Sequence, residues 1–265
     1  MKVLATVCNM LMKSIDRHRE YIMKKRTLII GASSDLATDI IPHLIREEGQ
    51  VGLHYAHNKN ALLPYEMKTN VRLIQRCIES ELDCKQIIDE YITWADGLDN
   101  LIILMGDVSH YCHWSELSCD DIIKDYSVNT VFPFLLVKYA YPHMIQNGGR
   151  IILVSTASAQ HGGGSYTLAY GMAKSALECL AKGLAKDLAK YNILVNAVAA
   201  GFIDTKFHTE RCHKTLEDME KRVDFVPLKR AGTKEEFGSL VCWMLTKEAG
   251  FVTGQVITID GGDFI

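Results

Sequence analysis

The sequence predicts an α/β fold with one doubly wound parallel sheet of about seven strands flanked by helices. Short runs rich in Val, Ile and Leu recur along the chain, as expected for parallel strands that are buried on both faces. Helical or mixed sequence follows each run except the last, and this alternation indicates crossover helices between parallel strands. The expected strands are Thr27–Ile30, Val51–Tyr55 and residues 71–75, 100–105, 150–155, 193–198 and 255–259.

The first strand leads into a segment that is typical of a phosphate-binding turn. It continues as Gly31-Ala-Ser-Ser-Asp-Leu-Ala37, and an apolar helical pattern follows to about Glu48. Backbone N–H groups and the helix dipole favour an anion at such a helix start. We therefore expect the turn to hold a pyrophosphate, and the candidate residues are Gly31, Ser33, Ser34, Asp35 and Leu36.

Tyr170-Gly-Met-Ala-Lys174 is the most informative short motif, because it places a phenol and an ammonium on one face of an apolar helical segment. A free phenol titrates near pH 10, so acid–base work at neutral pH requires lowering its pKa by about three units, roughly 4 kcal/mol. A unit charge about 4 Å away supplies on the order of 4 kcal/mol at an effective dielectric near 20. The motif therefore predicts that Lys174 lowers the pKa of Tyr170.

Composition fits one globular domain. The chain has 265 residues, of which 48% are hydrophobic, so it can bury a single large core. A net charge of −3 argues against a general nucleic-acid binder. The eight cysteines are scattered without a Cys-x-x-Cys pair, which favours reduced thiols and a cytoplasmic location. Cys112-His113 and Cys212-His213 lack the spacing of a zinc site, so no metal is expected.

The N-terminus stands apart from the rest of the chain. Residues 1–22 are expected to form an extension of unknown role, ahead of a catalytic domain at 23–265. The apolar run Val3–Met12 is too short to span a bilayer, and strongly charged sequence follows it. We therefore expect no membrane association.

Five motifs, in this order, resemble those of the short-chain dehydrogenase/reductase family. The resemblance runs from about Arg26 to Gly262. It implies a Rossmann-type domain that binds a nicotinamide dinucleotide and transfers hydride between its ring and a carbonyl carbon. The matching segments are Gly31–Ala37, Asn129 within Ser-Val-Asn-Thr, Tyr170 with Lys174, Asn196–Thr205 and Thr253–Gly262.

The resemblance also implies catalytic roles. Tyr170 would be the general acid or base, and Lys174 would lower its pKa and hold the nicotinamide ribose. Asn129 would keep a water beside Lys174, unless its amide only pins a helix backbone. Thr156 aligns with the family's substrate-positioning serine, and Ser158 is the alternative. Ser155 is expected on the opposite face of the strand.

The cofactor site departs from the family pattern at Asp35, which stands where the middle glycine is usual. We expect its carboxylate to cap the helix start rather than to face the pyrophosphate, which it would repel. At the end of the second strand Tyr55 replaces the acidic residue that selects NAD(H), and His57 and Lys59 follow. NADP(H) is therefore favoured, with NAD(H) as the alternative. Other expected cofactor contacts are Gly106, Tyr170, Lys174, Gly201, Ile203 and Thr205.

These features predict a carbonyl reductase or alcohol dehydrogenase. The segments Pro227–Gly232 and Thr253–Gly262 resemble 3-oxoacyl-carrier-protein reductases, so a small-molecule or acyl-carrier substrate is expected. Residues 205–226 would form the substrate lid, whose Lys206, Arg211 and Lys214 either bind an acidic substrate or are simply solvated. The family resemblance implies a homo-oligomer, a tetramer or dimer. The alternative function is a nucleotide-binding scaffold or sensor without turnover.

Overall fold

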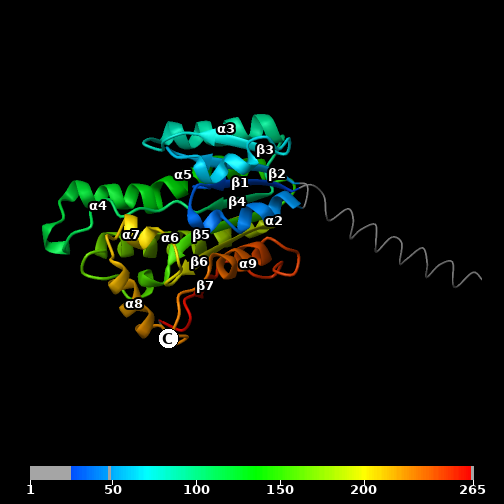
Figure 1. Cartoon of the computed structure of the whole chain (residues 1–265). Helices are drawn as coiled ribbons and strands as arrows, with labels where there is room; N and C mark the ends of the chain where they lie inside the picture. Colours follow the sequence, from blue (N-terminus) through cyan, green and yellow to red (C-terminus); the bar gives the residue numbers. More distant parts are fainter. Residues whose placement is uncertain (1–24, 47–48, 264–265) are drawn as a thin grey trace, which may run out of the picture.

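A seven-stranded parallel sheet organises the computed structural model, which describes residues 25–46 and 49–263. The strands lie in the order β3-β2-β1-β4-β5-β6-β7 (Figure 1). All seven predicted strands are confirmed; the five inner strands are largely buried as central parallel strands require, whereas the edge strands β3 and β7 are only partly buried. Their bounds are β1 (Arg26–Ile30), β2 (Gln50–Tyr55), β3 (Val71–Gln75), β4 (Asn100–Ile103), β5 (Gly149–Thr156), β6 (Ile193–Ala200) and β7 (Val256–Ile259). The expected extension at 1–22 lies outside the described residues.

Helices cover both faces of the sheet (Figure 1). Four of them begin with a capping box, in which a Ser or Thr and a carboxylate three residues later satisfy the first N–H groups. The helices are α2 (Ile40–Arg46), α3 (Glu81–Ala95), α4 (Cys119–Tyr126), α5 (Phe132–Ala140), α6 (Leu168–Leu188), α7 (Phe207–Glu210), α8 (Leu216–Phe225) and α9 (Lys234–Met244). Short helices are η1 (Asp35–Ala37), η2 (Asn60–Tyr65), η3 (Trp114–Glu116), η4 (Ser127–Val131, a π turn), η5 (Tyr141–His143), η6 (Ala157–Gln160) and η7 (Ala189–Tyr191).

The helical pattern after the first strand is not one helix to Glu48. It begins with η1, and α2 starts only at Ile40. Pro42 lies in the first turn of α2, where its missing N–H costs nothing, but its ring excludes helical continuation from the preceding turn. The last two residues of the expected helix, 47 and 48, lie outside the described residues.

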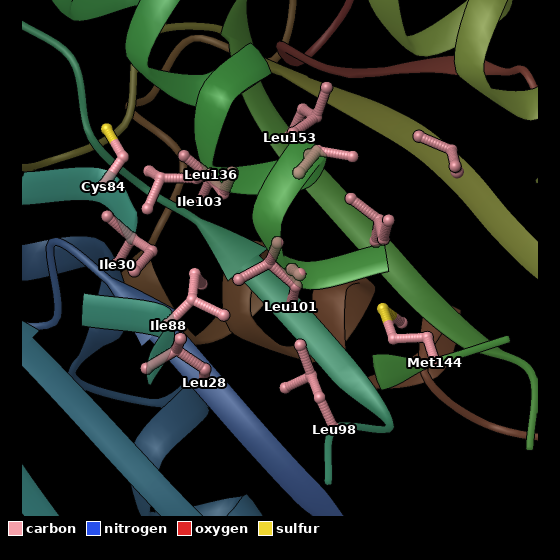
Figure 2. Close-up of a cluster of buried hydrophobic side chains, with 14 of the residues drawn as sticks. Leu28, Ile30, Cys84, Ile88, Leu98, Leu101, Ile103, Leu136, Met144 and Leu153 are labelled. Carbon is pink, nitrogen blue, oxygen red and sulfur yellow. The ribbon is translucent and has the colours of Figure 1, made fainter. Parts of the chain in front are cut away.

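Alternate strand residues divide the core into two layers. Leu28 and Ile30 pack with α3 and α5 on one face, as Figure 2 shows, whereas Ile29 packs with α2 and α9 on the other. Each fully buried aliphatic side chain contributes about 1.5–3 kcal/mol. Gly52 of β2 leaves room for one large ring, since a Cβ there would lie 2.4 Å from Cδ2 of Tyr91.

Candidate active site

The strand order reverses between β1 and β4, and this reversal opens a crevice at the carboxyl end of the sheet. The segments that follow four strands meet at this edge. Gly31 follows β1, Gly106 follows β4, Thr156 ends β5 and Gly201 follows β6. The topology therefore brings the predicted cofactor and catalytic segments to one site.

The turn after β1 has the backbone conformation that glycine permits. Gly31 has φ +77°, and a Cβ at this residue would lie 3.2 Å from the Met105 nitrogen. The η1 helix is capped by Ser34, whose Oγ accepts a hydrogen bond from Leu36 N at 3.3 Å. The prediction that Asp35 caps this helix is therefore wrong.

Asp35 turns toward the predicted lid instead. Its Oδ2 accepts a hydrogen bond from the backbone N–H of Lys206 at 2.8 Å, and its Oδ1 lies 3.9 Å from Nζ of Lys234. The carboxylate thus has two partners of its own, one from the segment after β6 and one from the start of α9. Sequence reasoning could not find a partner 171 positions away.

The buried side chain of His54 holds the turn in place through a hydrogen bond, a role that the sequence analysis did not predict. Its Nδ1 accepts from Gly31 N–H at 3.3 Å, so the ring proton is on Nε2, which donates to the carbonyl of Arg76 at 2.8 Å. Burial lowers the pKa of His54 to about 4. The neutral imidazole therefore ties the turn to the end of β3. A polar residue near the end of an otherwise apolar strand was the available signal.

Lys174 is 2% exposed on α6. Its Nζ donates to the carbonyl oxygens of Val154 at 2.8 Å and Met105 at 3.1 Å, and it lies 5.9 Å from the centre of the Tyr170 ring. Burial lowers its pKa to about 7. Gly106 makes room for this amine, because a Cβ there would lie 2.9 Å from Nζ.

The predicted lowering of the Tyr170 pKa is not produced by the side chains around it. Burial raises the pKa of the phenol, and the nearby Cys212, Asp125 and Asp107 raise it further, while contact with the Thr156 hydroxyl opposes them. Lys174 does not reverse this direction; its own amine is buried and donates to two carbonyl groups.

Asn129 lies in the π turn η4 and is fully buried. Its Oδ1 accepts from Asp107 N–H at 3.1 Å, and its Nδ2 donates to the carbonyls of Asp107 at 2.8 Å and Asp125 at 2.9 Å. Both ends of the amide are thus bonded to backbone. The structure supports the alternative role, in which this side chain pins the helix to the segment after β4.

The two hydroxyls at the end of β5 point to different partners. Ser155 is buried, and its Oγ donates to Glu178 Oε1 at 2.7 Å. Thr156 instead contacts the Tyr170 phenol, and its Oγ1 accepts from Ser158 N–H at 3.3 Å. The alternation of the strand therefore directs Ser155 away from Tyr170, as predicted, and brings Thr156 to it.

The segment 205–226, called the lid below, contains α7 and α8 and covers Tyr170. The ring of Phe207 lies 5.9 Å from the Tyr170 ring, which places α7 beside the start of α6 (Figure 1). Arg211 Nε lies 3.3 Å from Asp107 Oδ1, and Lys214 lies over the Tyr111 ring at 5.8 Å. Of the lid cations Lys206, Arg211 and Lys214 singled out in the sequence, the last two therefore have partners across the crevice.

The other end of the crevice, where an adenosine would lie, differs from expectation. Tyr55 is 6% exposed and donates to Gln75 Oε1 at 3.3 Å. Lys59 is paired with Glu66 at 2.7 Å, and His57 lies 3.5 Å from the Cys77 thiol. Arg76, which sequence reasoning missed, has a buried Nε without a hydrogen-bond partner among the described residues. Arg76 is therefore a cation with an unused N–H donor at the adenosine end of the crevice.

The segment after β6 is held firmly. A Cβ at Gly201 would lie 2.4 Å from Cβ of Asp260, and Ile203 is 3% exposed in a bridge with Gly232. The Thr205 hydroxyl donates to the Ile203 carbonyl at 3.4 Å. A cavity of about 250 Å³ lies beyond Ile203, away from Tyr170, between Phe202 and β7. These contacts fix the start of the lid.

Residues 25–46 and 49–263 contain neither a grouped set of metal ligands nor a membrane-spanning helix. In this part of the chain no three His, Cys, Asp or Glu side chains are grouped to hold a metal ion. No helix there combines the length and apolar character needed to cross a membrane.

Comparison with known proteins identifies the family. A family model described as enoyl-(acyl carrier protein) reductase matches residues 11–263. The chain belongs to the short-chain dehydrogenase/reductase family. An uncharacterized oxidoreductase of Bacillus subtilis is 28% identical over 247 residues, covering 91% of this chain and 99% of the relative.

Solved structures of short-chain dehydrogenases agree with this assignment. The enzyme from Serratia marcescens has a TM-score of 0.83 at 26% identity, covering 92% of this chain and 100% of that chain. An NADPH-dependent reductase involved in bacilysin biosynthesis has a TM-score of 0.81 at 25% identity, covering 90% and 98%. The protein is thus an oxidoreductase of this family.

Short-chain dehydrogenases use an NAD(P)-type nucleotide, and the residues at the crevice fit one. Among the described residues, no hydrogen bond engages the N–H groups of Ser33 and Asp35 in the turn. Free N–H groups at a helix start suit a diphosphate. Gly106 leaves room for the amine of Lys174, the group that would hold a ribose.

Proposed function

We propose that this short-chain dehydrogenase is an NADP(H)-dependent carbonyl reductase with Tyr170 as its acid–base residue. The contact between the hydroxyls of Thr156 and Tyr170 at the mouth of the crevice carries this proposal. Two hydroxyls that meet in this way hold one substrate oxygen from two sides. Lys174 lies behind the pair, 5.9 Å from the Tyr170 ring.

The chain's own groups account for the proton in such a reduction. When bound, the reduced nucleotide would supply the hydride. Tyr170 gives its phenolic proton to the substrate oxygen, so its O–H bond breaks as the new one forms. Lys174, with a pKa of about 7, both gains and loses a proton near neutral pH, which suits it to restoring the phenol. Phe207 shields the site from water.

The preference for NADP(H) rests on Arg76 and on the lack of a carboxylate at Tyr55. A guanidinium with a spare donor suits a 2′-phosphate. The similar solved structure described as NADPH-dependent supports this preference. For the substrate we propose a 3-oxoacyl group on a carrier, which the lid cations Arg211 and Lys214 would meet at the mouth.

The test measures binding and turnover separately. NADPH and NADH are titrated by cofactor fluorescence, and oxidation of each is followed with a panel of ketones, aldehydes and 3-oxoacyl thioesters. Tyr170→Phe should lower kcat by at least about a thousandfold while the cofactor Kd stays unchanged. Tyr191→Phe, at the far end of the same helical region, is the control. Cofactor binding without turnover of any panel member would favour the scaffold function instead.

We also propose that the protein is a homo-oligomer, a dimer or tetramer. Large apolar side chains are exposed on α5 and around α9, among them Phe134 at 45%, Trp243 at 42% and Phe251 at 103%. Such surfaces mark protein contacts when they are contiguous. Light scattering at micromolar concentration gives the mass, and a monomer would refute the proposal. The cytoplasmic location stays a prediction from the sequence.

A further inference from the structure

The Asp35 side chain connects the cofactor turn after β1 to the start of the lid. Asp35 is the first residue of η1, in the turn proposed to hold the cofactor diphosphate. Its Oδ2 accepts the backbone N–H of Lys206 at 2.8 Å. Lys206 immediately precedes Phe207, whose ring lies 5.9 Å from Tyr170. One hydrogen bond therefore links the cofactor turn to the residue that covers the catalytic phenol.

The ammonium group of Lys234 lies close enough to the Asp35 carboxylate to compensate its charge. Lys234, the first residue of α9, lies 3.9 Å from Oδ1, and the Asp35 side chain is 24% exposed. A hydrogen bond to an ionised carboxylate is stronger than one between neutral groups. The two partners therefore hold the carboxylate toward the start of the lid and the start of α9.

A second carboxylate holds the other end of α7. Arg211, which follows α7, lies 3.3 Å from Asp107, and Asp107 follows β4. Asp35 follows β1. The short helix is thus anchored at each end by an acidic residue, from the two strands between which the sheet order reverses.

We propose that Asp35 is a positioning residue that couples nucleotide binding at the turn to closure of the lid over Tyr170. This inference rests on the proposed binding of a dinucleotide. A diphosphate bound by the free N–H groups of the turn would order the turn and so fix the Asp35 side chain where it accepts the Lys206 N–H, and the bound anion therefore favours the lid-closed arrangement. By linkage, the closed lid favours the anion equally.

Four variants separate the contribution of the Asp35–Lys206 hydrogen bond from that of the Asp35 charge. Asp35→Ala removes the hydrogen bond and the charge, whereas Asp35→Asn keeps an acceptor for Lys206 and removes only the charge. Lys206→Pro removes the N–H donor together with the Lys206 ammonium group, and the φ of −66° at Lys206 suits proline. Lys234→Met removes only the cation. Melting curves of all four establish that they fold.

The readouts are the NADPH Kd, the KM and kcat with a panel substrate, and lid cleavage by endoproteinase Glu-C after Glu210 and Glu217. In wild-type protein, saturating NADPH should slow this cleavage about fivefold or more. Asp35→Ala and Lys206→Pro should lose the protection and raise KM about fivefold, with a smaller change in kcat. Asp35→Asn should keep the protection and bind NADPH at least as tightly. Lys234→Met should show partial loss.

The outcomes distinguish this inference from the proposed function. Unchanged NADPH-dependent protection in both Asp35→Ala and Lys206→Pro would overturn the coupling while leaving the reductase proposal intact. Equal loss in Asp35→Asn would show that charge rather than the hydrogen bond acts, and would overturn the link through Lys206. Failure of wild-type protein to bind either dinucleotide would overturn both.

Discussion

Replacing Lys174 by methionine should stabilise the fold at neutral pH while removing activity. The amine is 2% exposed, and burial lowers its pKa from 10.5 to about 7. This lowering corresponds to roughly 5 kcal/mol, at about 1.4 kcal/mol for each pKa unit. Methionine does not bear this cost, but it leaves the carbonyls of Val154 and Met105 without their donor, a loss of about 1 kcal/mol each.

The net effect changes sign with pH. The unfolded chain keeps the Lys174 proton up to about pH 10.5, and the folded chain keeps it only to about pH 7, so wild-type stability rises between these values. At pH 6.5 the variant should be more stable by about 3 kcal/mol, and at pH 9.5 it should be less stable by about 1 kcal/mol.

Urea unfolding followed by far-UV circular dichroism at pH 6.5 and 9.5 measures the difference. Lys186→Met, an exposed lysine on the same helix, is the control and should show little dependence on pH. A variant that is less stable than wild type at both pH values, by a constant amount, would refute the idea that burial discharges this amine.

Three further predictions concern stability. Asn129→Ala should lower the free energy of unfolding by about 3 kcal/mol, because three backbone groups lose their partners; urea denaturation measures it, and a loss below 1 kcal/mol would contradict the pinning role. Wild-type stability should fall as pH drops from 6.5 toward 4, because the folded chain refuses a proton on His54 that the unfolded chain accepts; thermal melts of His54→Gln should show a flatter acid limb, and identical limbs would exclude this group. Gly52→Ala should cost about 1–3 kcal/mol through overlap with the Tyr91 ring; an unchanged melting temperature would show that the ring moves freely.

Almost all of the fold could be predicted, because strands that are buried on both faces appear in the sequence as short apolar runs. A central parallel strand is buried on both faces, so Thr27–Ile30 was visible as an apolar run, whereas residues 71–75 form an edge strand with exposed Arg72 and Gln75. The helix starts were less visible. The expected pattern to Glu48 took no account of Pro42, and only the tertiary packing placed the start of α2 at Ile40.

The sequence predicted which residues make up the site better than it predicted the partners that their side chains bind. Tyr170, Lys174 and Thr156 converge as the motif spacing suggests, because strand and helix periods fix which residues share a face. The partners of Asp35 and Lys174 could not be foreseen. A backbone N–H or carbonyl from a distant segment carries no residue-specific signal, and these groups decide the orientation of both charges.

In the π turn η4 the number of residues matters more for the orientation of α5 than the identity of those residues does. Its five residues, Ser127–Val131, lie between two ordinary helices in one continuous stretch, and a residue added to a helix advances its phase by about 100°. Phe132 and Leu136 face the core only with that advance in place. Removing any one residue there would leave every helical preference intact and still turn the apolar side of α5 toward water.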